Sequence, residues 1–255
     1  MTRRLAALGL PCLGVLAWQC IVWLWAPRSW LLPSPAQVAA TAVDHRGRLW
    51  FHAQATLLET GVGLAVAVAV GLVLAVGIAA SRVLDLTLSP WVVASQAVPV
   101  LSLAPILAIW LGYTTTQIAV AALMCVFPVI VTAVDGFRAA DPGLIRTMRS
   151  MGAGRAWLWR HVTLPSALPV MFSGLRMAAV FAVTGAVVAE YVGADRGLGY
   201  LTVISTGQFD TRLAMAAVGL LALIGIGLFG LVAACERLAF PHRSRPTRPS
   251  WRAHL

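Results

Sequence analysis

The side chains that could do chemistry are the polar and ionisable residues lying within long apolar runs. Such residues are costly in hydrocarbon and mark solute paths by default, and prolines among them kink helices and free carbonyl groups. The candidates for a pore or gate are Gln96, Pro99, Pro105, Arg176 and Glu190. Simpler roles stay open, because Gln96 could hydrogen-bond a neighbouring helix, Arg176 could snorkel to the surface, and Glu190 could be an ordinary interfacial carboxylate.

We expect no catalytic or metal centre. The five histidines (His45, His52, His161, His242 and His254) all lie outside the apolar runs, and none forms an HExxH pattern. The four cysteines form no CxxC pair. The GxGxxG pattern at residues 225–230 lies inside an apolar run with no preceding strand, so we interpret its glycines as helix-packing positions.

The composition indicates a membrane protein. The chain has 255 residues, of which 60% are hydrophobic and 11% charged, whereas soluble domains average about a quarter charged residues. Its net charge of +10 is carried by arginine alone. A nucleic-acid surface requires basic residues clustered on an exposed face, but these arginines punctuate apolar runs. A soluble enzyme and a nucleic-acid-binding protein are therefore excluded.

Six apolar segments predict an all-α protein with six transmembrane helices, because a helix of about 20 residues spans the hydrocarbon core. They are residues 5–25, 57–80, 90–111, 117–134, 168–190 and 213–235. We interpret the first as an uncleaved span rather than a signal peptide. Residues 33–52 are expected to include a short helix on the membrane surface.

The arginines predict the orientation, since cytoplasmic segments are enriched in them. With a cytoplasmic N-terminus, five arginines lie outside: Arg28, Arg46, Arg48, Arg196 and Arg212. Thirteen then lie inside: Arg3, Arg4, Arg82, Arg138, Arg146, Arg149, Arg155, Arg160, Arg237, Arg243, Arg245, Arg248 and Arg252. We therefore expect both termini in the cytoplasm.

One cytoplasmic loop, residues 135–166, is far longer than the others and carries five arginines. Asp141 followed by Pro142 predicts a helix start. Leu144, Ile145, Met148 and Met151 share one helical face, with Arg146 and Arg149 on another. Gly152 and Gly154 should end this helix, a second short helix should pass through residues 157–159, and Pro165 should stop it. Such helices could lie on lipid headgroups or dock a partner.

The loop resembles the "EAA" loop of permease subunits of binding-protein-dependent ABC importers. Gly152, nine intervening residues and the run Val162-Thr163-Leu164-Pro165 carry the likeness. Further stretches resemble the nitrate, sulfonate and taurine branch, which includes permeases for thiamine pyrimidine precursors. They are residues 96–99, 103–105, 109–113, 127–128, 134–136, 149–153 and 197–199.

The resemblance implies a type I ABC importer permease fold of six helices in a bacterial inner membrane. It implies a homodimer of this subunit, two ATPase subunits that bind ATP and Mg²⁺, and an extracytoplasmic solute-binding protein. No cofactor is expected in this chain. The implied ATPase-coupling residues are Asp141, Leu144, Ile145, Arg146, Met148, Arg149, Gly152, Ala153, Trp157, Leu164 and Pro165; Asp195, Arg196, Gly197 and Gly199 form a turn suited to the binding protein.

One residue departs from the motif. The acid that gives the loop its name would fall at Arg146, with Thr147 and Met148 in place of two alanines. A carboxylate contact to the ATPase is therefore not expected, and the partner should carry a compensating acidic patch.

We expect three regions along the chain: a first helix (1–31), a permease core (32–236) and a basic cytoplasmic tail (237–255). The solute stays open among sulfonate, nitrate, taurine and pyrimidine-precursor types. The alternatives are a secondary transporter, which would normally show internal repeats and charged midplane residues, and a membrane-embedded enzyme.

Overall fold

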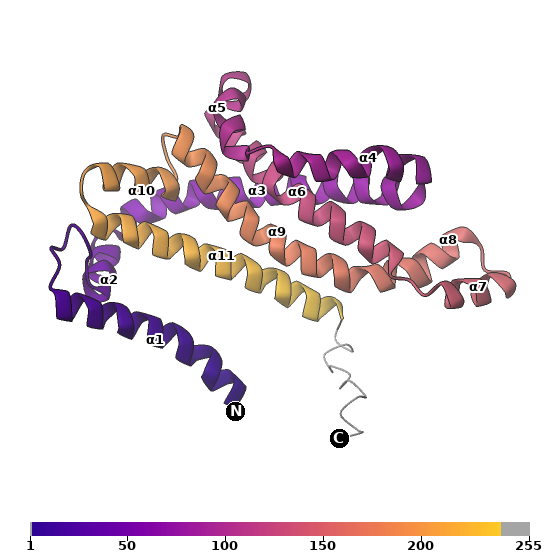
Figure 1. Cartoon of the computed structure of the whole chain (residues 1–255), viewed down its shortest axis with the longest axis horizontal. Helices are drawn as coiled ribbons and strands as arrows, with labels where there is room; N and C mark the ends of the chain where they lie inside the picture. Colours follow the sequence, from indigo (N-terminus) through magenta and orange to yellow (C-terminus); the bar gives the residue numbers. More distant parts are fainter. Residues whose placement is uncertain (1, 241–255) are drawn as a thin grey trace. The chain divides into compact units, whose positions relative to one another are not determined.

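The computed structural model describes residues 2–240, and side chains from Cys12 onward. Residues 241–255, with most of the expected basic tail, lie outside the described part. Every regular element from 2 to 240 is a helix (Figure 1). The helices are α1 (Thr2–Trp25), α2 (Pro35–Asp44), α3 (Arg46–Ala80), α4 (Arg82–Ala94), η1 (Ser95–Ala97), α5 (Val100–Leu111), α6 (Tyr113–Arg138), α7 (Pro142–Ser150), α8 (Arg155–Leu158), η2 (Trp159–Thr163), α9 (Leu164–Val192), α10 (Leu198–Gly207) and α11 (Thr211–Ala239).

The prediction of an all-helical membrane protein is confirmed, but six spans are not. Within residues 2–240, four helices are long and apolar enough to cross a bilayer: α3, α6, α11 and the continuous run Arg155–Val192. A fifth is counted if α4 to α5 make one broken span, while Cys12–Trp25 of α1 is a shorter apolar helix. Within residues 33–52, where a short surface helix is expected, the structure has α2, with Ser34 as its N-cap and Pro35 in its first turn.

The expected third span, 90–111, is not one helix. Val98 is extended (φ −84°, ψ 119°) because the proline after it disfavours the helical conformation. Helix α5 restarts at Val100, with Pro99 as its N-cap. Pro105 lies inside α5 without ending it.

The prediction that Pro165 ends the second loop helix is wrong. Residues 159–163 form a π-helix, in which the N–H of Leu164 bonds to the carbonyl of Trp159 five residues back. Pro165 needs no acceptor, and we infer that the wide turn before it accommodates its ring. The helix therefore continues through Pro165 into α9, giving one helical run from Arg155 to Val192.

The chain divides into two compact units. Unit 1 holds the described part of residues 1–63, together with 99–123 and 182–224. In it, small residues bring three helices together at Ala121 of α6. A Cβ at Gly63 of α3 would lie 2.7 Å from the Cβ of Ala121, and one at Gly185 of α9 would lie 2.8 Å from its Cα. Small residues permit such close helix packing within a membrane.

Unit 2 holds residues 64–98 and 124–181 and the described part of 225–255. Its core consists of aliphatic and aromatic side chains from α3, α6 and α9: Ala75, Ile78, Ile130, Ala133, Val134, Phe137 and Ala167. Helices α6 and α9 approach closely at Gly136, where a Cβ would lie 2.8 Å from the carbonyl oxygen of Ala167. A second, smaller core consists of Ala140, Leu158 and Val162.

Candidate functional site

The start of α10, in unit 1, is held by side chains from other helices. The first N–H groups of a helix have no acceptor within it. Here three successive N–H groups donate to side chains: Gly197 to Nδ1 of His52 (3.1 Å), Leu198 to Oγ1 of Thr56 (2.9 Å) and Gly199 to Oε2 of Glu190 (2.5 Å). Since His52 and Thr56 belong to α3 and Glu190 to α9, these bonds fix α10 against both helices.

Two carboxyl groups lie at the centre of this arrangement. Glu59 and Glu190 are each 2% exposed, and their carboxyl groups lie close enough to interact directly. Oγ1 of Thr56 donates to Oε1 of Glu190 (2.7 Å). When the Gln117 amide is oriented to give both its atoms partners, its nitrogen donates to Oε1 of Glu59 (3.2 Å). We call His52, Thr56, Glu59, Glu190 and the backbone of residues 197–199 the α10 cluster.

Two glycines allow Glu190 to reach the backbone. Gly197 has φ +127°, and a methyl group there would overlap the carboxyl of Glu190. At Gly199 a Cβ would lie 2.8 Å from Oε2 of the same residue. Of the four residues expected to contact the binding protein, only Asp195 and Arg196 are exposed, whereas Gly197 and Gly199 are buried.

The long loop of unit 2 has the helix start that the sequence predicts. Asp141 caps α7, and its Oδ1 accepts from the N–H of Gly143 (2.8 Å). Gly152 follows the helix with φ +88°, a left-handed conformation that favours glycine. The N–H of Ala153 then bonds to the carbonyl of Met148 (3.0 Å) and closes the turn. We call residues 141–163 the α7–α8 segment.

The predicted apolar face of this segment is split between two surroundings. Ile145, Met148 and Ala153 pack against a small core of Ala140, Leu158 and Val162. Leu144, Met151 and Trp157 are instead exposed, by 42%, 75% and 44%. Leu164 is half-buried and Pro165 exposed at the start of α9. The exposed apolar side chains have no cover within the described part of the chain.

The same segment carries four arginines. They are Arg146, Arg149, Arg155 and Arg160, and all are exposed. The ion pairs found between residues 2 and 240 involve Arg138 and Arg176, and none of these four. The segment therefore offers a positive, partly apolar surface, and Arg146 is part of it.

Arg176 is neutralised within unit 2. Its Nη2 lies 3.1 Å from Oε2 of Glu236 of α11, and its guanidinium lies 5.9 Å from the ring centroid of Phe229. Gln96, by contrast, is exposed in η1, and its amide donates to Oγ of Ser95 (3.4 Å). The pore candidates are therefore not one cluster: Gln96 and Pro99 lie at the helix break, Pro105 inside α5, Arg176 in an ion pair and Glu190 in the α10 cluster.

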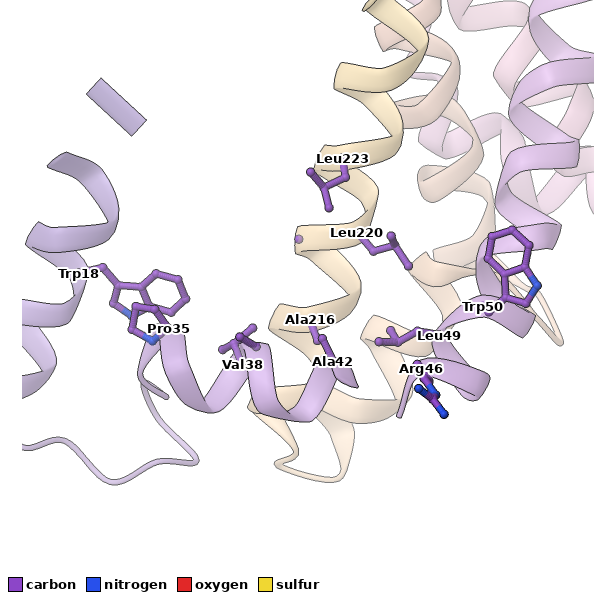
Figure 2. Close-up of a pocket in the computed structure, with 12 residues that line it drawn as sticks. Trp18, Pro35, Val38, Ala42, Arg46, Leu49, Trp50, Ala216, Leu220 and Leu223 are labelled. Carbon is purple, nitrogen blue, oxygen red and sulfur yellow. The ribbon is translucent and has the colours of Figure 1, made fainter. Parts of the chain in front are cut away.

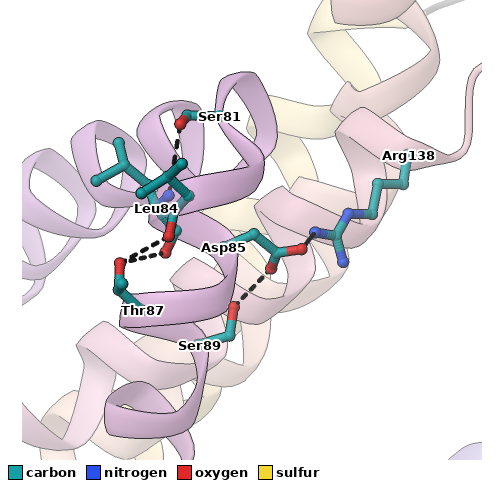
Figure 3. Close-up of polar contacts among 7 residues, drawn as sticks. Ser81, Leu84, Asp85, Thr87, Ser89 and Arg138 are labelled. Atoms are coloured by element: carbon teal, nitrogen blue, oxygen red, sulfur yellow. Dashed lines mark hydrogen bonds and ion pairs between the residues drawn. The ribbon is translucent and has the colours of Figure 1, made fainter.

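A third polar group ties α4 to the end of α6 within unit 2 (Figure 3). Oδ2 of Asp85 lies 2.8 Å from Nη2 of Arg138, and Oδ1 accepts from Oγ of Ser89 (2.8 Å). Ser81 caps the same helix at the N–H of Leu84 (3.4 Å). These bonds orient the helix that leads into the break at Val98.

Unit 1 also has an open groove of about 440 Å³ along α2 (Figure 2). Its lining is apolar except for Arg46, and the labelled side chains come from α1, α2, α3 and α11. Trp18 lies at one end of the labelled residues in Figure 2. Its indole N–H donates to the carbonyl of Pro33 (3.1 Å). The groove therefore has one cationic side chain and no carboxylate with which to bind a hydrophilic solute.

The residues that sequence reasoning missed are Thr56 and Glu59, together with the role of His52. We expected the second span to begin at residue 57 and no histidine to lie inside a span. Instead α3 begins at Arg46, and His52 is 7% exposed. The spacing of residues 52, 56 and 59 could have indicated the cluster, because it places them on one helical face. An acid in a membrane helix is also a candidate functional site by default. Between residues 2 and 240, no three His, Cys, Asp or Glu side chains gather as a metal site.

A family profile matches two thirds of the chain. Residues 67–239 match the binding-protein-dependent transport system inner membrane component family. The chain belongs to this family. The permease has curated relatives over most of its length. It is 35% identical over 218 residues to the formylaminopyrimidine transport permease protein ThiX of Halalkalibacterium halodurans, covering 85% of this chain and 87% of the relative.

Two further relatives are also transport permeases. The riboflavin transport system permease protein RibX of Chloroflexus aurantiacus is 40% identical over 238 residues, covering 91% of this chain and 89% of the relative. The taurine transport system permease protein TauC of Escherichia coli is 32% identical over 217 residues, covering 81% and 78%. The chain is therefore a permease subunit of an ABC importer of the sulfonate, taurine and pyrimidine branch. Neither a secondary transporter nor a membrane enzyme is favoured.

Solved structures show the same fold. The permease matches an amino acid ABC transporter crystallised with histidines at a TM-score of 0.65 and 17% identity, covering 78% of this chain and 97% of the other. It matches the inward-facing MetNI methionine ABC transporter at a TM-score of 0.60 and 20% identity, covering 75% and 97%. Permeases of this family are membrane proteins and not themselves enzymes, and they work with ATPase and binding-protein partners.

Proposed function

We propose that this permease forms the pore of a homodimeric importer and couples to two ATPase subunits through the α7–α8 segment. The observation that carries the proposal is the surface of that segment. Its arginines have no acidic partner between residues 2 and 240, and Leu144, Met151 and Trp157 are exposed beside them. Apolar anchors on a short helix suit a groove in a partner protein. ATP and Mg²⁺ belong to that partner.

The proposed orientation places both termini and the α7–α8 segment in the cytoplasm. It is supported by the thirteen arginines that this topology puts inside, against five outside. Asp195 and Arg196 then lie on the extracytoplasmic side, where they are exposed and can contact a solute-binding protein. Within a bacterial inner membrane, α1 and the α4–α5 pair would supply the fifth and sixth spans.

We propose that the solute is a small nitrogen heterocycle of the pyrimidine type. The relatives named for formylaminopyrimidine and riboflavin transport are 35% and 40% identical to this chain, and the taurine relative is 32% identical. The charge of Arg176 supports the same choice. It lies well inside α9 but is paired with Glu236, so it offers no free cation to a sulfonate.

The coupling proposal is tested by charge insertion at Gly152. The Gly152→Asp variant introduces a side chain where the backbone has φ +88°, and it should abolish ATP-dependent uptake and co-purification of the ATPase. Gly154→Asp is the matched control, because it adds the same charge two residues away where φ is −73° and space is open. Stable assembly and full uptake in Gly152→Asp would contradict the coupling role.

The solute proposal is tested separately by uptake into proteoliposomes containing the permease, its ATPase and its binding protein. Labelled formylaminopyrimidine should accumulate with ATP, and excess unlabelled taurine should not compete. Accumulation of taurine instead would overturn the solute class while leaving the coupling proposal intact.

A further inference from the structure

The carboxyl groups of Glu59 and Glu190 are in contact in a buried site, and transport coupling gives them no role. Each residue is 2% exposed. A carboxylate only accepts hydrogen bonds, so a bond between two carboxyl groups requires a proton on one of them. Like charges this close disfavour the doubly ionised state, most of all away from water. The contact therefore implies that the pair holds a proton.

The hydrogen bonds around the pair identify which residue carries it. Both oxygens of Glu190 already accept: Oε1 from Thr56 (2.7 Å) and Oε2 from the N–H of Gly199 (2.5 Å). The N–H of Tyr200 also lies near this carboxyl. Glu190 is thus surrounded by donors, which is the environment of a carboxylate.

Glu59 has the complementary environment. Its Oε1 accepts from the amide nitrogen of Gln117 (3.2 Å), whereas its buried Oε2 meets no donor from the described residues. An unpartnered buried oxygen costs free energy unless it acts as a donor itself. A proton on Oε2 of Glu59, directed at Glu190, would give the oxygen a partner.

We propose that Glu59 and Glu190 share one proton, which is bound to Glu59 and donated in a hydrogen bond to Glu190, and that this pair is the positioning element that holds α10 against α3 and α9. The remaining negative charge then lies on Glu190 at the N-terminus of α10, where the helix dipole stabilises it. Ionisation of Glu59 would place a second negative charge beside the first and push the two helices apart.

Other titratable groups surround the pair, so the pH test must separate their effects. Arg196 and Asp195 act on Glu59 electrostatically with opposite signs. His52 accepts the N–H of Gly197 through Nδ1, so it must be unprotonated there, and its ring lies 5.8 Å from that of Tyr200. The side chain of Gln117 also bonds to the carbonyl of Tyr113 (3.1 Å). Acidification therefore loosens α10 through His52, and alkalinisation loosens it through Glu59.

The first experiment detects the proton directly by infrared difference spectroscopy of the purified full-length permease between neutral and alkaline pH. The wild type should show the carbonyl stretch of a protonated carboxyl group, which disappears as pH rises. Glu59→Gln should lack this band. Absence of the band in the wild type, or its survival in Glu59→Gln, would overturn the proposal.

The second experiment measures uptake against pH in the assembled transporter. Glu59→Gln keeps a neutral donor and acceptor, so its uptake should stay within about twofold of wild type near neutrality and should no longer fall at alkaline pH. Glu190→Gln removes an acceptor from buried N–H groups and should lose about tenfold or more. A wild-type alkaline limb that survives in Glu59→Gln would exclude Glu59 as the titrating group.

The uptake readout rests on the proposed function, whereas the infrared readout does not. Co-purification of the ATPase with Glu59→Gln and Glu190→Gln separates the two failures. If the pair positions α10 alone, both variants should retain the ATPase, because its proposed contact is the α7–α8 segment. Loss of the ATPase in Glu59→Gln but not in Gly152→Asp would contradict both assignments.

Discussion

The α10 cluster and the α7–α8 segment both contain charged residues beside glycines, but they satisfy those charges differently. In the α10 cluster each oxygen of Glu190 accepts a hydrogen bond from a neighbouring element, and the carboxyl is 2% exposed. In the α7–α8 segment Arg146 and its neighbouring arginines are exposed, and none of the ion pairs found within residues 2–240 involves them.

This difference separates positioning from recognition. A buried charge must be satisfied inside the protein, because leaving it unpaired is costly, so the α10 cluster stabilises one arrangement of α3, α9 and α10. An exposed charge beside exposed apolar side chains costs little and gains when a complementary surface covers it. Substitutions should therefore lower stability in the first region and alter assembly in the second.

The largest effect is expected for Gly197→Ala in the α10 cluster. The substitution places a methyl group on the carboxyl of Glu190 at a residue with φ +127°. Overpacking and the unfavourable backbone conformation together should lower the free energy of unfolding by about 3 kcal/mol. The melting temperature of the purified permease in detergent measures this.

Gly207→Ala is the matched control for that substitution. Gly207 is the last residue of α10, and a Cβ there would meet nothing within 4 Å. Its melting temperature should stay close to that of the wild type. Equal melting temperatures for Gly197→Ala and Gly207→Ala would contradict the claim that stability requires glycine beside Glu190.

A smaller loss of stability is expected for Thr56→Val. Valine keeps the shape of threonine but leaves the N–H of Leu198 without its acceptor and Glu190 without a donor. Unsatisfied buried groups of this kind cost about 1–3 kcal/mol. In the control, Thr206→Val, the exposed threonine bonds only to the carbonyl of Thr202 in its own helix. A loss in Thr206→Val as large as that in Thr56→Val would show that any hydroxyl on these helices matters equally.

The sequence predicts the helices and the α7–α8 turn well, because their signals are local. Asp141 before Pro142 marks a helix start, and Gly152 marks a helix end, and both are confirmed. The failure at Pro165 is also local in origin. A proline normally ends a helix, but the preceding π-turn, which is not visible as a sequence pattern, allows α9 to continue.

The α10 cluster could not be predicted as a unit because it joins residues far apart in the chain. Thr56 and Glu190 are separated by 134 positions, and only helix packing brings them together. The sequence indicates Glu190 and Gly197 only separately, as a gate candidate and a turn residue. The low average charge of the spans hides Glu59, although a single acid within a span is a stronger sign of a site than that average.

The smallest effect on stability, and the sharpest effect on recognition, is expected for Arg146→Glu. Arg146 is exposed, so charge reversal should change the free energy of unfolding by less than about 0.5 kcal/mol. We expect the partner surface that meets this position to be adapted to arginine. The affinity for the ATPase should therefore fall at low ionic strength and approach that of the wild type as salt screens the charges.

Arg149→Glu, a reversal on the same helix α7, separates position from net charge. If Arg146 contacts an acidic patch on the ATPase, its reversal should change the salt dependence of assembly more than reversal at Arg149. The measurement is the fraction of ATPase retained by immobilised permease across a salt series. If both variants change the salt profile equally, the segment acts only as a diffuse positive surface. If both variants have the salt profile of the wild type, neither arginine is recognised by a partner, and the α7–α8 segment is not the recognition surface that distinguishes it from the α10 cluster.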